Sequence, residues 1–400
     1  MAVYLESPCK ADSLLESLPF PTGSSERARA QSLFLGALRH GHRTMHLLDQ
    51  LIKKKPRPLT EAILLISGFE LFDSTSERQA KIIHHAVGQA KQWASQAESG
   101  LVNAVLRKLP GALESIDTDD LAAHLSHPSW LVQHWQEQFG QNATRALLEW
   151  NQNIPVNHIE IPGDCIPEDL QKTQWPGFYR LPAGGITTAI AQLLDSGQAY
   201  IKDPSTRIAP ELLAPEPGHS VLDFCAAPGG KAFDMARLMQ GSGKIVAVDL
   251  PGSRIGRLKE NLARLQSADL QTDIIECDGL ALDKVRLPDL FDAVMLDAPC
   301  SNSGVIQRRT DVKWRLDRND FEKCAHLQSQ LLHSAARFVR PGGRIVYSTC
   351  SIEASENRLI VENFLGSKAG QSFSLLKSAM SYPWETGHDG AGACLLQRIG

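Results

Sequence analysis

The stretch that decides the fold is His219-Ser220-Val221-Leu222-Asp223-Phe224-Cys225-Ala226-Ala227-Pro228-Gly229-Gly230-Lys231. Val221 and Leu222 fit the end of a buried strand, with Asp223 at its carboxyl edge. A tight turn without bulky side chains follows, and residues 231–239 have a helical pattern. A strand, a glycine turn and a helix N-terminus form a cradle for a nucleoside-bearing cofactor. Taken alone, the stretch also fits an ordinary strand-to-helix turn.

The next strand and helix strengthen the cofactor interpretation. Residues 244–248 fit a strand that ends in Asp249, and the helix after it contains Arg254 and Asn261. An acid at the end of the second strand, some twenty residues after the glycine turn, is placed to bind ribose hydroxyls.

Strands and helices alternate from His219 to the C-terminus. We expect strands near 220–224, 244–249, 271–276, 291–297 and 343–348, and helices near 230–240, 253–265, 320–339 and 355–366. This alternation predicts an α/β Rossmann-like domain with a parallel sheet that binds its ligands at the carboxyl ends of the strands. Polar or reactive groups follow five of these predicted strand ends: Asp223, Asp249, Asp278, Asp297 and Cys350.

The first third of the chain has a different pattern. Residues 24–108 show helical periodicity and no strand signal, which predicts an all-α domain with helices at 27–40, 45–52, 61–72, 78–94 and 101–109. Residues 110–120 fit a linker, two more helices follow, and proline- and glycine-punctuated segments over 153–200 suggest a small α+β module. We therefore expect a helical domain at 1–120, linker helices and a small module at 121–200, and a catalytic domain at 201–400.

Composition excludes several classes of protein. The chain has 400 residues, 42% apolar residues and a net charge of −4, so any nucleic-acid binding must rest on local basic patches. Its eight cysteines form no CxxC pair, which favours reduced thiols and predicts neither a metal site nor a disulfide framework. The N-terminus does not resemble a signal peptide, and no run of about eighteen apolar residues predicts a membrane span.

Two cysteines come directly after buried strands of the predicted sheet. Cys300 follows Asp297 in Leu296-Asp297-Ala298-Pro299-Cys300-Ser301, and Cys350 follows Tyr347-Ser348-Thr349. A lone cysteine is usually a small buried apolar residue, but two of them at one sheet edge beside a cofactor turn indicate chemistry. A thiolate that adds to C6 of cytosine makes C5 nucleophilic, so that C5 can accept an electrophilic methyl group. These residues alone leave open which thiol attacks and which assists release.

The motifs resemble those of the RNA (cytosine-5) methyltransferase family. The resemblance rests on the quoted glycine stretch, on residues 294–305, and on residues 345–357 with Glu356-Asn357. Residues 304–315, which include Thr310-Asp311-Val312-Lys313-Trp314, are similar to the small-subunit (16S) rRNA enzymes of the RsmB/Fmu/Sun type. Residues 25–108 are similar to the NusB-like RNA-binding domain that precedes the catalytic part in those enzymes.

The resemblance implies a role for each candidate site residue. Cys350 would be the nucleophile, Cys300 would promote product release, and Asp297 would lie between cofactor and target base. The cofactor, S-adenosylmethionine, would be bound by Cys225, Ala226, Ala227, Pro228, Gly229, Gly230, Lys231, Asp249, Arg254, Asp278 and Asp297. It also implies a seven-stranded class I methyltransferase sheet.

Several positions depart from the family pattern. Lys202 stands where glutamine is usual, Thr310 where proline is usual, and Glu160 where an arginine is usual. Ala391-Gly392 stand where the family has an aromatic pair. These changes leave the catalytic motifs intact and concern the contacts with RNA.

Two basic stretches are candidates for RNA contacts. Lys53, Lys54 and Lys55 lie in a proline-containing turn, where a solvated face is the plainer alternative. Arg308, Arg309 and Lys313 lie next to the catalytic loop, where phosphates flanking a displaced base would need to be held.

We therefore expect a cytoplasmic, monomeric enzyme without metal that methylates C5 of a cytosine in small-subunit rRNA. The alternatives are the same reaction on tRNA or another rRNA site, and a non-catalytic RNA-binding factor. The last has no chemical need for two thiols beside a cofactor turn.

Overall fold

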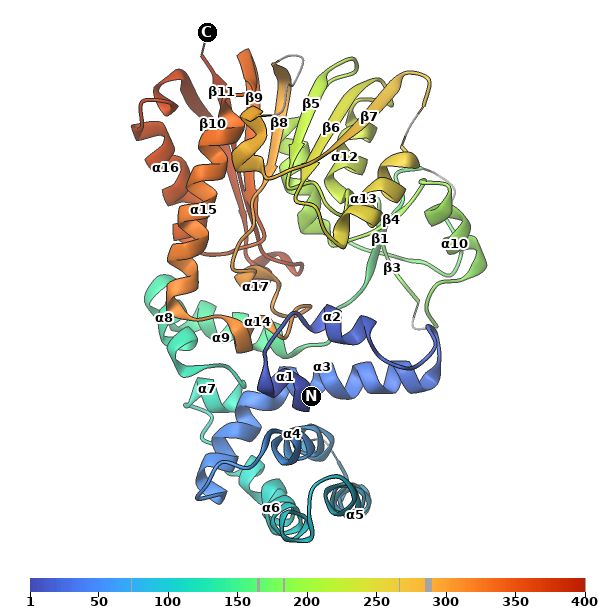
Figure 1. Cartoon of the computed structure of the whole chain (residues 1–400), viewed down its shortest axis with the longest axis vertical. Coiled ribbons are helices and arrows are strands. Elements are labelled where there is room, and N and C mark those ends of the chain that lie inside the picture. Colours follow the sequence, from blue (N-terminus) through green and yellow to red (C-terminus); the bar gives the residue numbers. More distant parts are fainter. Residues whose placement is uncertain (73, 164–165, 183, 266, 285–289, 400) are drawn as a thin grey trace. The chain divides into compact units, whose positions relative to one another are not determined.

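The computed structural model describes residues 1–72, 74–163, 166–182, 184–265, 267–284 and 290–399. Cys165, one of the eight cysteines counted above, lies outside them. The chain forms two units, residues 1–154 with 306–316 and residues 155–305 with 317–400 (Figure 1). The division into three parts expected from the sequence remains a prediction.

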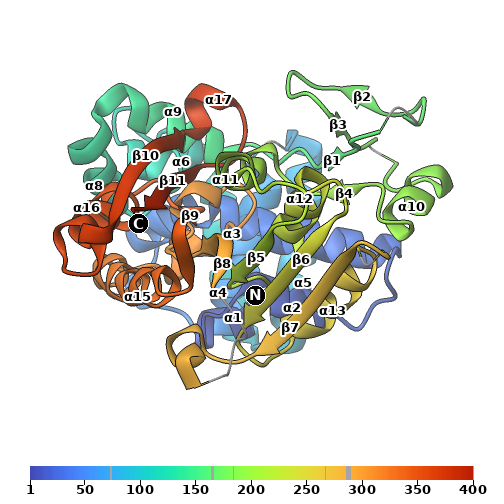
Figure 2. The same ribbon diagram turned by 90° about the horizontal axis from the view of Figure 1, so that it is seen from above.

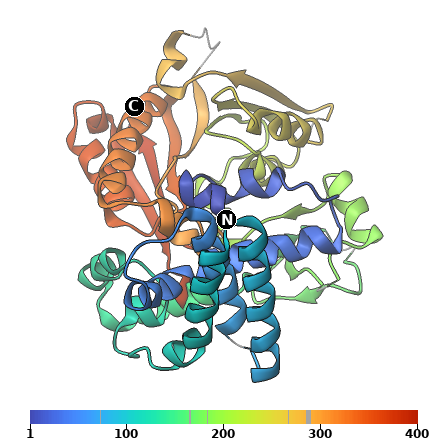
Figure 3. The same cartoon turned by 60° about the horizontal axis from the view of Figure 1, so that its bottom comes forward.

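The first unit is built of helices, and those of residues 1–154 run from blue to teal in Figure 3. They are α1 (Ala2–Glu6), α2 (Ala11–Glu16), α3 (Ser25–Leu51), α4 (Pro58–Phe72), α5 (Ser76–Trp93), α6 (Gln96–Glu114), α7 (Leu121–His124), α8 (Ser129–Phe139), α9 (Gln141–Gln152) and, from the later segment, α14 (Val312–Arg315). Leucine, isoleucine and valine side chains of α3 to α6 form one core cluster of this unit. The predicted all-α domain is confirmed.

Helix α3 is longer than the sequence pattern predicts. Residues 27–40 and 45–52 appear as separate helices in the sequence, but the structure has one helix that the Ser24 hydroxyl caps. Gly41, near the predicted break, lies against the ring of Trp314, where an added Cβ would come within 2.4 Å of the ring. The glycine therefore provides space for a distant aromatic residue and does not interrupt the helix.

The second unit contains a seven-stranded sheet in the order β10-β11-β9-β8-β5-β6-β7, which Figure 2 shows from above. The strands are β5 (Ser220–Phe224), β6 (Gly243–Asp249), β7 (Leu270–Glu276), β8 (Phe291–Asp297), β9 (Val339–Thr349), β10 (Phe373–Ser381) and β11 (Ala391–Arg398). The five strands predicted from the sequence are parallel to one another, whereas β11 pairs antiparallel with both β9 and β10. The expected Rossmann-like fold is confirmed, with an antiparallel edge that the sequence reading did not place.

Both faces of this sheet are covered. Leu222 and Phe224 of β5 pack on one face with helices α15 (Arg318–Ala336) and α16 (Arg358–Gly366). Val221 packs on the other face with α11 (Ile208–Leu213), α12 (Gly230–Leu238) and α13 (Arg254–Ala263). Successive side chains of a strand point to opposite faces, so a strand buried on both sides is apolar nearly throughout. The polar Asp223 within β5 is therefore unusual.

A four-stranded antiparallel sheet, in the order β2-β3-β1-β4, precedes the large sheet. Its strands are β1 (His158–Glu160), β2 (Gln171–Lys172), β3 (Phe178–Arg180) and β4 (Tyr200–Ile201), and α10 (Thr188–Asp195) lies before β4. Short turns complete the unit at Pro204–Arg207, Gly279–Lys284, Ser303–Val305, Ala354–Glu356, Gly370–Ser372 and α17 (Pro383–Thr386).

The two departures from the family pattern near this small sheet face each other. The Lys202 ammonium lies 2.6 Å from a Glu160 carboxylate oxygen and 2.5 Å from an Asp234 carboxylate oxygen of α12. All three side chains are buried. Glu160, Lys202 and Asp234 thus form a group of ion pairs that joins the small sheet to α12.

Candidate active site

The two cysteines of the catalytic motifs lie side by side. Strands β8 and β9 are parallel neighbours with Asp297 opposite Ser348, so the residues after them emerge at one edge of the sheet. The Sγ atoms of Cys300 and Cys350 are 3.2 Å apart. The hydrogen bond to Cys350 and burial raise the pKa of Cys300 well above its usual range. Cys300 is therefore held as a neutral thiol.

Asn302 links the two cysteines, and the sequence reading did not identify it. The Cys350 thiol donates to Asn302 Oδ1 over 3.3 Å, and Asn302 Nδ2 donates to the Cys300 carbonyl over 2.9 Å. Its φ is +63°, a left-handed conformation that asparagine tolerates better than most residues. An asparagine directly after Cys-Ser was the signal that could have drawn attention to it.

The loop after Cys300 and the loop after Cys350 are fastened together. The Gly304 amide donates to the Cys350 carbonyl over 3.1 Å, and the Gly390 amide donates to the Gly304 carbonyl over 2.8 Å. A Cβ on Gly304 would lie 2.7 Å from the Cys350 carbonyl oxygen, which is too close for any side chain. Only glycine allows this approach.

Glu356 binds the loop that carries Cys300. The sequence did not predict a functional role for it. Its Oε2 accepts from the Ser301 amide over 3.0 Å and from Gln328 Nε2 over 3.2 Å. The same Gln328 nitrogen donates to the Pro299 carbonyl over 2.9 Å. Burial raises the pKa of Glu356, and the hydrogen bonds from Ser301 and Gln328 oppose that shift. The sequence identifies Glu356-Asn357 as part of a motif but predicts no role for either residue.

Asp297 stands between the cysteines and the glycine turn. The Lys231 ammonium lies 2.6 Å from Asp297 Oδ2, and the Ser348 hydroxyl donates to Oδ1 over 3.2 Å. Burial works against the charge of Lys231, but the ion pair with Asp297 outweighs it and raises the pKa of the lysine. The pair thus joins the start of α12 to the end of β8.

The glycine turn is a tightly bonded backbone loop. After β5 the chain passes through Cys225 at φ +59°, a cis peptide bond between Ala227 and Pro228, and Gly229 at φ +104° before α12 begins at Gly230. A Cβ on Gly229 would crowd α13, since it would lie 3.3 Å from the Asn261 Cβ. The Asn261 side chain donates to the Pro228 carbonyl over 2.7 Å.

Two further acids follow β6 and β7. Asp249 Oδ2 accepts from the Ala227 amide over 2.8 Å, and Arg254 lies 3.4 Å from Oδ1. Asp278, just past β7, accepts from the Leu280 amide over 2.9 Å. The structure therefore brings Asp249 and Arg254 to the glycine turn and leaves Asp278 at the end of the next strand.

These residues fit a cofactor that combines a ribose with cationic groups. The turn offers backbone and small side chains, and three carboxylates, Asp249, Asp278 and Asp297, face the same edge of the sheet. Asp223 adds a fourth carboxyl group that is fully buried, with no hydrogen-bond partner for either oxygen among the residues that the structure describes.

The expected RNA contacts divide into exposed and buried residues. Lys53, Lys54 and Lys55 are exposed between α3 and α4, and Lys55 lies 3.4 Å from Glu61. Arg309 is exposed and lies 3.7 Å from Asp12, whereas Arg308 is half-buried.

Lys313 does not fit the expectation of a phosphate contact. It is 2% exposed, and its ammonium donates to the carbonyls of Arg39 and Ser126 over 2.6 Å and 2.5 Å. Burial, with Arg39 and Arg43 nearby, lowers its pKa well below the usual range. An ammonium enclosed in this way cannot reach a phosphate, and the expectation is corrected: Lys313 anchors its segment in the helical unit.

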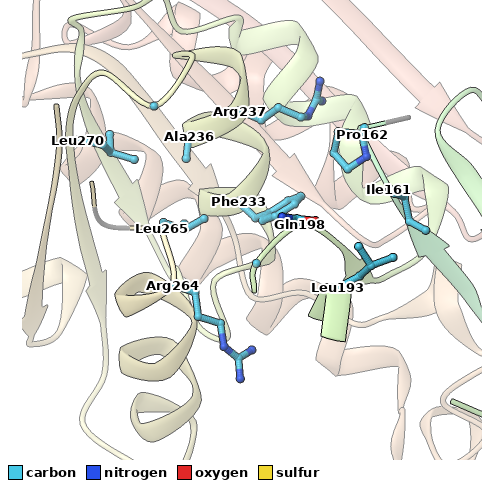
Figure 4. Close-up of a pocket in the computed structure, with 13 residues that line it drawn as sticks. Ile161, Pro162, Leu193, Gln198, Phe233, Ala236, Arg237, Arg264, Leu265 and Leu270 are labelled. Atoms are coloured by element: carbon cyan, nitrogen blue, oxygen red, sulfur yellow. The ribbon is translucent and has the colours of Figure 1, made fainter. Parts of the chain in front are cut away.

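A separate hollow of about 660 Å³ opens between the small sheet and α12 and α13 (Figure 4). Phe233, Leu193 and Leu265 line it, with Arg237 and Arg264 at its borders. None of its lining residues is a predicted site residue.

Two further observations concern metal ions and membranes. Within the described parts of the chain, no group of three or more His, Cys, Asp or Glu side chains could hold a metal ion. Over the same residues, no helix combines the length and the apolar character that a membrane span needs.

Comparison with known proteins places this site in a family. Residues 10–110 match the NusB family, and residues 210–387 match the family described as 16S rRNA methyltransferase RsmB/F. The ribosomal RNA small subunit methyltransferase B of Sodalis glossinidius is 31% identical over 400 residues, with 91% of this chain and 87% of that protein covered.

Solved structures share the fold. The crystal structure of PH0851 has a TM-score of 0.80 and 22% identity, with 99% of this chain and 97% of that chain covered. NSun6 from Pyrococcus horikoshii, solved with SFG, has a TM-score of 0.58 and 16% identity, with 68% and 98% covered.

Fold, site and relatives define an S-adenosylmethionine-dependent RNA methyltransferase. More narrowly, the chain belongs to the RsmB/F family of 16S rRNA methyltransferases, with a NusB-like domain in front of its catalytic part.

Proposed function

We propose that this protein methylates C5 of a cytosine in 16S rRNA through a covalent bond between Cys350 and C6 of the base. The observation that carries the proposal is the 3.2 Å approach of the Cys300 and Cys350 sulfur atoms at the strand ends next to Asp297. RNA binding alone gives no reason for two thiols in contact.

The surroundings of the two thiols support the roles proposed for them. Cys350 lies directly after β9, and its thiol donates a hydrogen bond to Asn302. A target cytosine whose C6 atom approaches from the side of Asn302 would therefore meet the Cys350 sulfur. As the sulfur loses its proton to solvent and bonds to C6, the C5–C6 double bond opens, an enamine forms across C4 and C5, and C5 becomes nucleophilic. S-adenosylmethionine supplies the electrophilic methyl group at that point.

Release of the product needs two further events. The C5 proton must pass to a base, and the bond between Cys350 and C6 must then break by β-elimination, which restores the aromatic ring. Cys300 is a neutral thiol in contact with Cys350, so it is placed to exchange a proton with the departing sulfur. Asp297, held by Lys231 and Ser348, would orient the target base beside the cofactor.

The cofactor would lie across the glycine turn. Residues 225–231 would surround its methionine and ribose parts, Asp249 with Arg254 would bind the ribose hydroxyls, and Asp278 would lie by the adenine. The exposed Lys53, Lys54 and Lys55, with Arg308 and Arg309, would contact RNA phosphates. We further propose a monomer that acts in the cytoplasm.

The test uses three proteins: wild type, Cys300→Ala and Cys350→Ala. Each is incubated with 16S rRNA transcript and S-adenosylmethionine and then separated on a denaturing gel. We expect a stable RNA–protein adduct with Cys300→Ala, because release is blocked, and none with Cys350→Ala.

Other outcomes point elsewhere. An adduct that forms only with Cys350→Ala would exchange the roles of the two cysteines. Methyl transfer to tRNA, or to another rRNA and not to the 16S transcript, would keep the chemistry and change the target. S-adenosylmethionine that fails to bind at all would favour a non-catalytic RNA-binding factor.

A further inference from the structure

Asp223 is a carboxyl group in an environment that does not suit a charge. It is the fourth residue of β5, in the middle of the sheet, and its side chain is 0% exposed. Neither carboxyl oxygen accepts a hydrogen bond from any group in the described part of the chain. A buried carboxylate without partners is strongly disfavoured, and such a group binds a proton to avoid the charge.

The charges that surround Asp223 come from each neighbouring element. Lys231 of α12 attracts a carboxylate at this position, whereas Asp297 of β8 and Asp249 of β6 repel it. Cys225, two residues further on and directly after β5, is a thiol whose pKa is raised by burial and by these acids.

The formal charges balance only when Asp223 is neutral. Lys231 is paired with Asp297, and Asp249 is paired with Arg254 of α13. These two pairs sum to zero, so an ionised Asp223 would leave one buried negative charge without a counterion. Burial is the largest influence and raises the pKa of Asp223 to about 8.

S-adenosylmethionine can supply the missing positive charge. Its sulfonium and ammonium groups outweigh its carboxylate, so the molecule carries a net charge of +1. After methyl transfer the sulfonium becomes a neutral thioether, and the product has no net charge. The cofactor and its product therefore differ by one positive charge close to the reacting atoms.

We propose that Asp223 is the residue that discriminates the charged methyl donor from its demethylated product: it holds a proton in the free protein and releases it when the donor binds. The proposal rests on the cofactor part of the proposed function. The proton passes from the Asp223 carboxyl group to solvent, and the carboxylate left behind balances the donor's charge. When the charge disappears from the cofactor, Asp223 recovers a proton and the product is bound less tightly.

The direction with pH follows from linkage. Because the donor binds with release of a proton, its affinity rises with pH up to the pKa of free Asp223 and levels off above it. The affinity for the demethylated product changes little over the same range, since its binding leaves Asp223 protonated.

The experiment measures the number of protons released when the ligand binds and does not depend on methyl transfer. Isothermal titration calorimetry of the full chain, without RNA, is done at pH 7 in two buffers with different ionisation enthalpies, once with S-adenosylmethionine and once with S-adenosylhomocysteine. We expect release of about one proton per donor bound, since a group with a pKa near 8 is mostly protonated at pH 7, and close to none for the product.

Two variants assign the proton. Asp223→Asn keeps the shape of the side chain and cannot ionise, so the release should vanish and the preference for donor over product should fall about tenfold or more, as expected for one lost charge interaction. Asp273→Asn removes an exposed carboxylate of β7 that pairs with Lys244, and it should behave like wild type.

Each result bears on the proposal separately from methyl transfer. Equal proton release for donor and product, or release that persists in Asp223→Asn, would overturn it while leaving the Cys350 reaction intact. If Asp223→Asn does not fold, the wild-type proton counts for the two ligands still decide. A donor that does not bind wild type at all would overturn both this inference and the cofactor assignment, whereas an absent Cys350 adduct would affect the proposed function alone.

Discussion

Asn302 shows how one side chain can organise a reactive pair. It occupies a left-handed backbone conformation, and its amide joins the Cys300 carbonyl to the Cys350 thiol. The direction in which the Cys350 proton points is therefore set by a residue that has no chemistry of its own. Orientation of this kind costs little in the free protein and is available when the base arrives.

Replacing Asn302 separates orientation from backbone strain. Asn302→Gly keeps the φ of +63° without strain and removes both hydrogen bonds, so we expect an unchanged melting temperature. In a Cys300→Ala background, it should slow adduct formation about fivefold, the equivalent of about 1 kcal/mol for a lost hydrogen bond. Quenched time points on denaturing gels measure the rate.

A β-branched residue at the same position serves as the contrast. Asn302→Val cannot adopt this φ comfortably and should destabilise the protein by about 1–2 kcal/mol in denaturant unfolding. If Asn302→Gly forms the adduct as fast as its parent, the side chain has no orienting role.

The sequence predicted the residues of this site better than their contacts. Cys300, Cys350 and Asp297 could be placed at one sheet edge because parallel strands end together. Asn302 and Glu356 could not be assigned roles, because their partners are main-chain groups that only the folded loops bring near. Asp223 was visible at a strand end, but its lack of partners is a property of the packed sheet.

At the scale of elements, helix α3 carries two half-buried histidines, His40 and His42. His40 lies stacked between Phe69 and Phe72, and His42 stacks on Trp314 with ring centroids 4.3 Å apart. Burial, with nearby Lys313, lowers the pKa of both histidines to about 3. These rings are neutral in the folded helix and become charged readily once it unfolds.

The helical unit should therefore lose stability in mild acid. Below pH 6.5 the unfolded chain binds protons on His40 and His42 that the folded unit does not, so stability present at neutral pH falls as the pH drops. At pH 5 the loss is about 2 kcal/mol for each histidine. Urea unfolding followed by tryptophan fluorescence at pH 7.5 and pH 5 measures it.

Matched substitutions test whether the histidines cause the difference in stability between pH 7.5 and pH 5. His42→Phe keeps the stacking on Trp314 and cannot titrate, so it should reduce the difference between the two pH values by its share. His85→Gln, on the exposed side of α5, should leave that difference unchanged. A His42→Phe protein with the full wild-type difference would contradict the assignment.

The ion pair between β1 and the residue after β4 predicts a strong coupling. Lys202→Met would leave Glu160 and Asp234 buried with only Arg207 and Arg237, at 3.4–4.0 Å, as cations, and should lower the free energy of unfolding by about 3 kcal/mol. Neutralising all three side chains, with Glu160→Gln and Asp234→Asn added, should cost less than Lys202→Met alone.

An exposed pair provides the comparison. Lys244→Met breaks the ion pair with Asp273 at the surface and should change the stability by no more than about 1 kcal/mol. Denaturant titrations give all these values. Equal losses for Lys202→Met and Lys244→Met would show that the buried network is not cooperative.

Strands with a clear apolar pattern were predicted closely, and each exception has a physical cause. Five strands of the large sheet fall within a few residues of their predicted positions because buried parallel strands are continuously apolar. The antiparallel strands β10 and β11 were not placed, since β10 is exposed over most of its length and lacks a buried pattern. Lys313 looked like a phosphate contact because the carbonyls that enclose it come from residues nearly two hundred or more positions away.

At the scale of the whole molecule, the first unit is not continuous in sequence. Residues 306–316 belong to it although residues 155–305 separate them from the rest. Tyr4 donates to the Asp311 carbonyl over 3.2 Å, Trp314 donates to the Leu38 carbonyl over 2.8 Å, and Arg39 donates to the Gln307 carbonyl over 2.8 Å. The segment is thus an internal part of the helical unit.

A fragment of residues 1–154 should be destabilised because it lacks residues 306–316. Without the segment, the side chains and carbonyls that receive Lys313 and Trp314 are exposed, so we expect a lower melting temperature than for the helical unit in the full chain. A synthetic peptide of residues 306–316 should raise it in a concentration-dependent way. The same peptide with Lys313→Glu should not, and stabilisation by both peptides alike would refute specific docking.

The placement of residues 306–316 also sets an order of events during synthesis. The ribosome has made most of the chain, including the strand that leads to Cys300, before the last piece of the helical unit emerges. Until then the part of the N-terminal helices that contacts residues 306–316 is uncovered, and the helices need protection from aggregation. For the same reason a single cut in the gene cannot separate the two units.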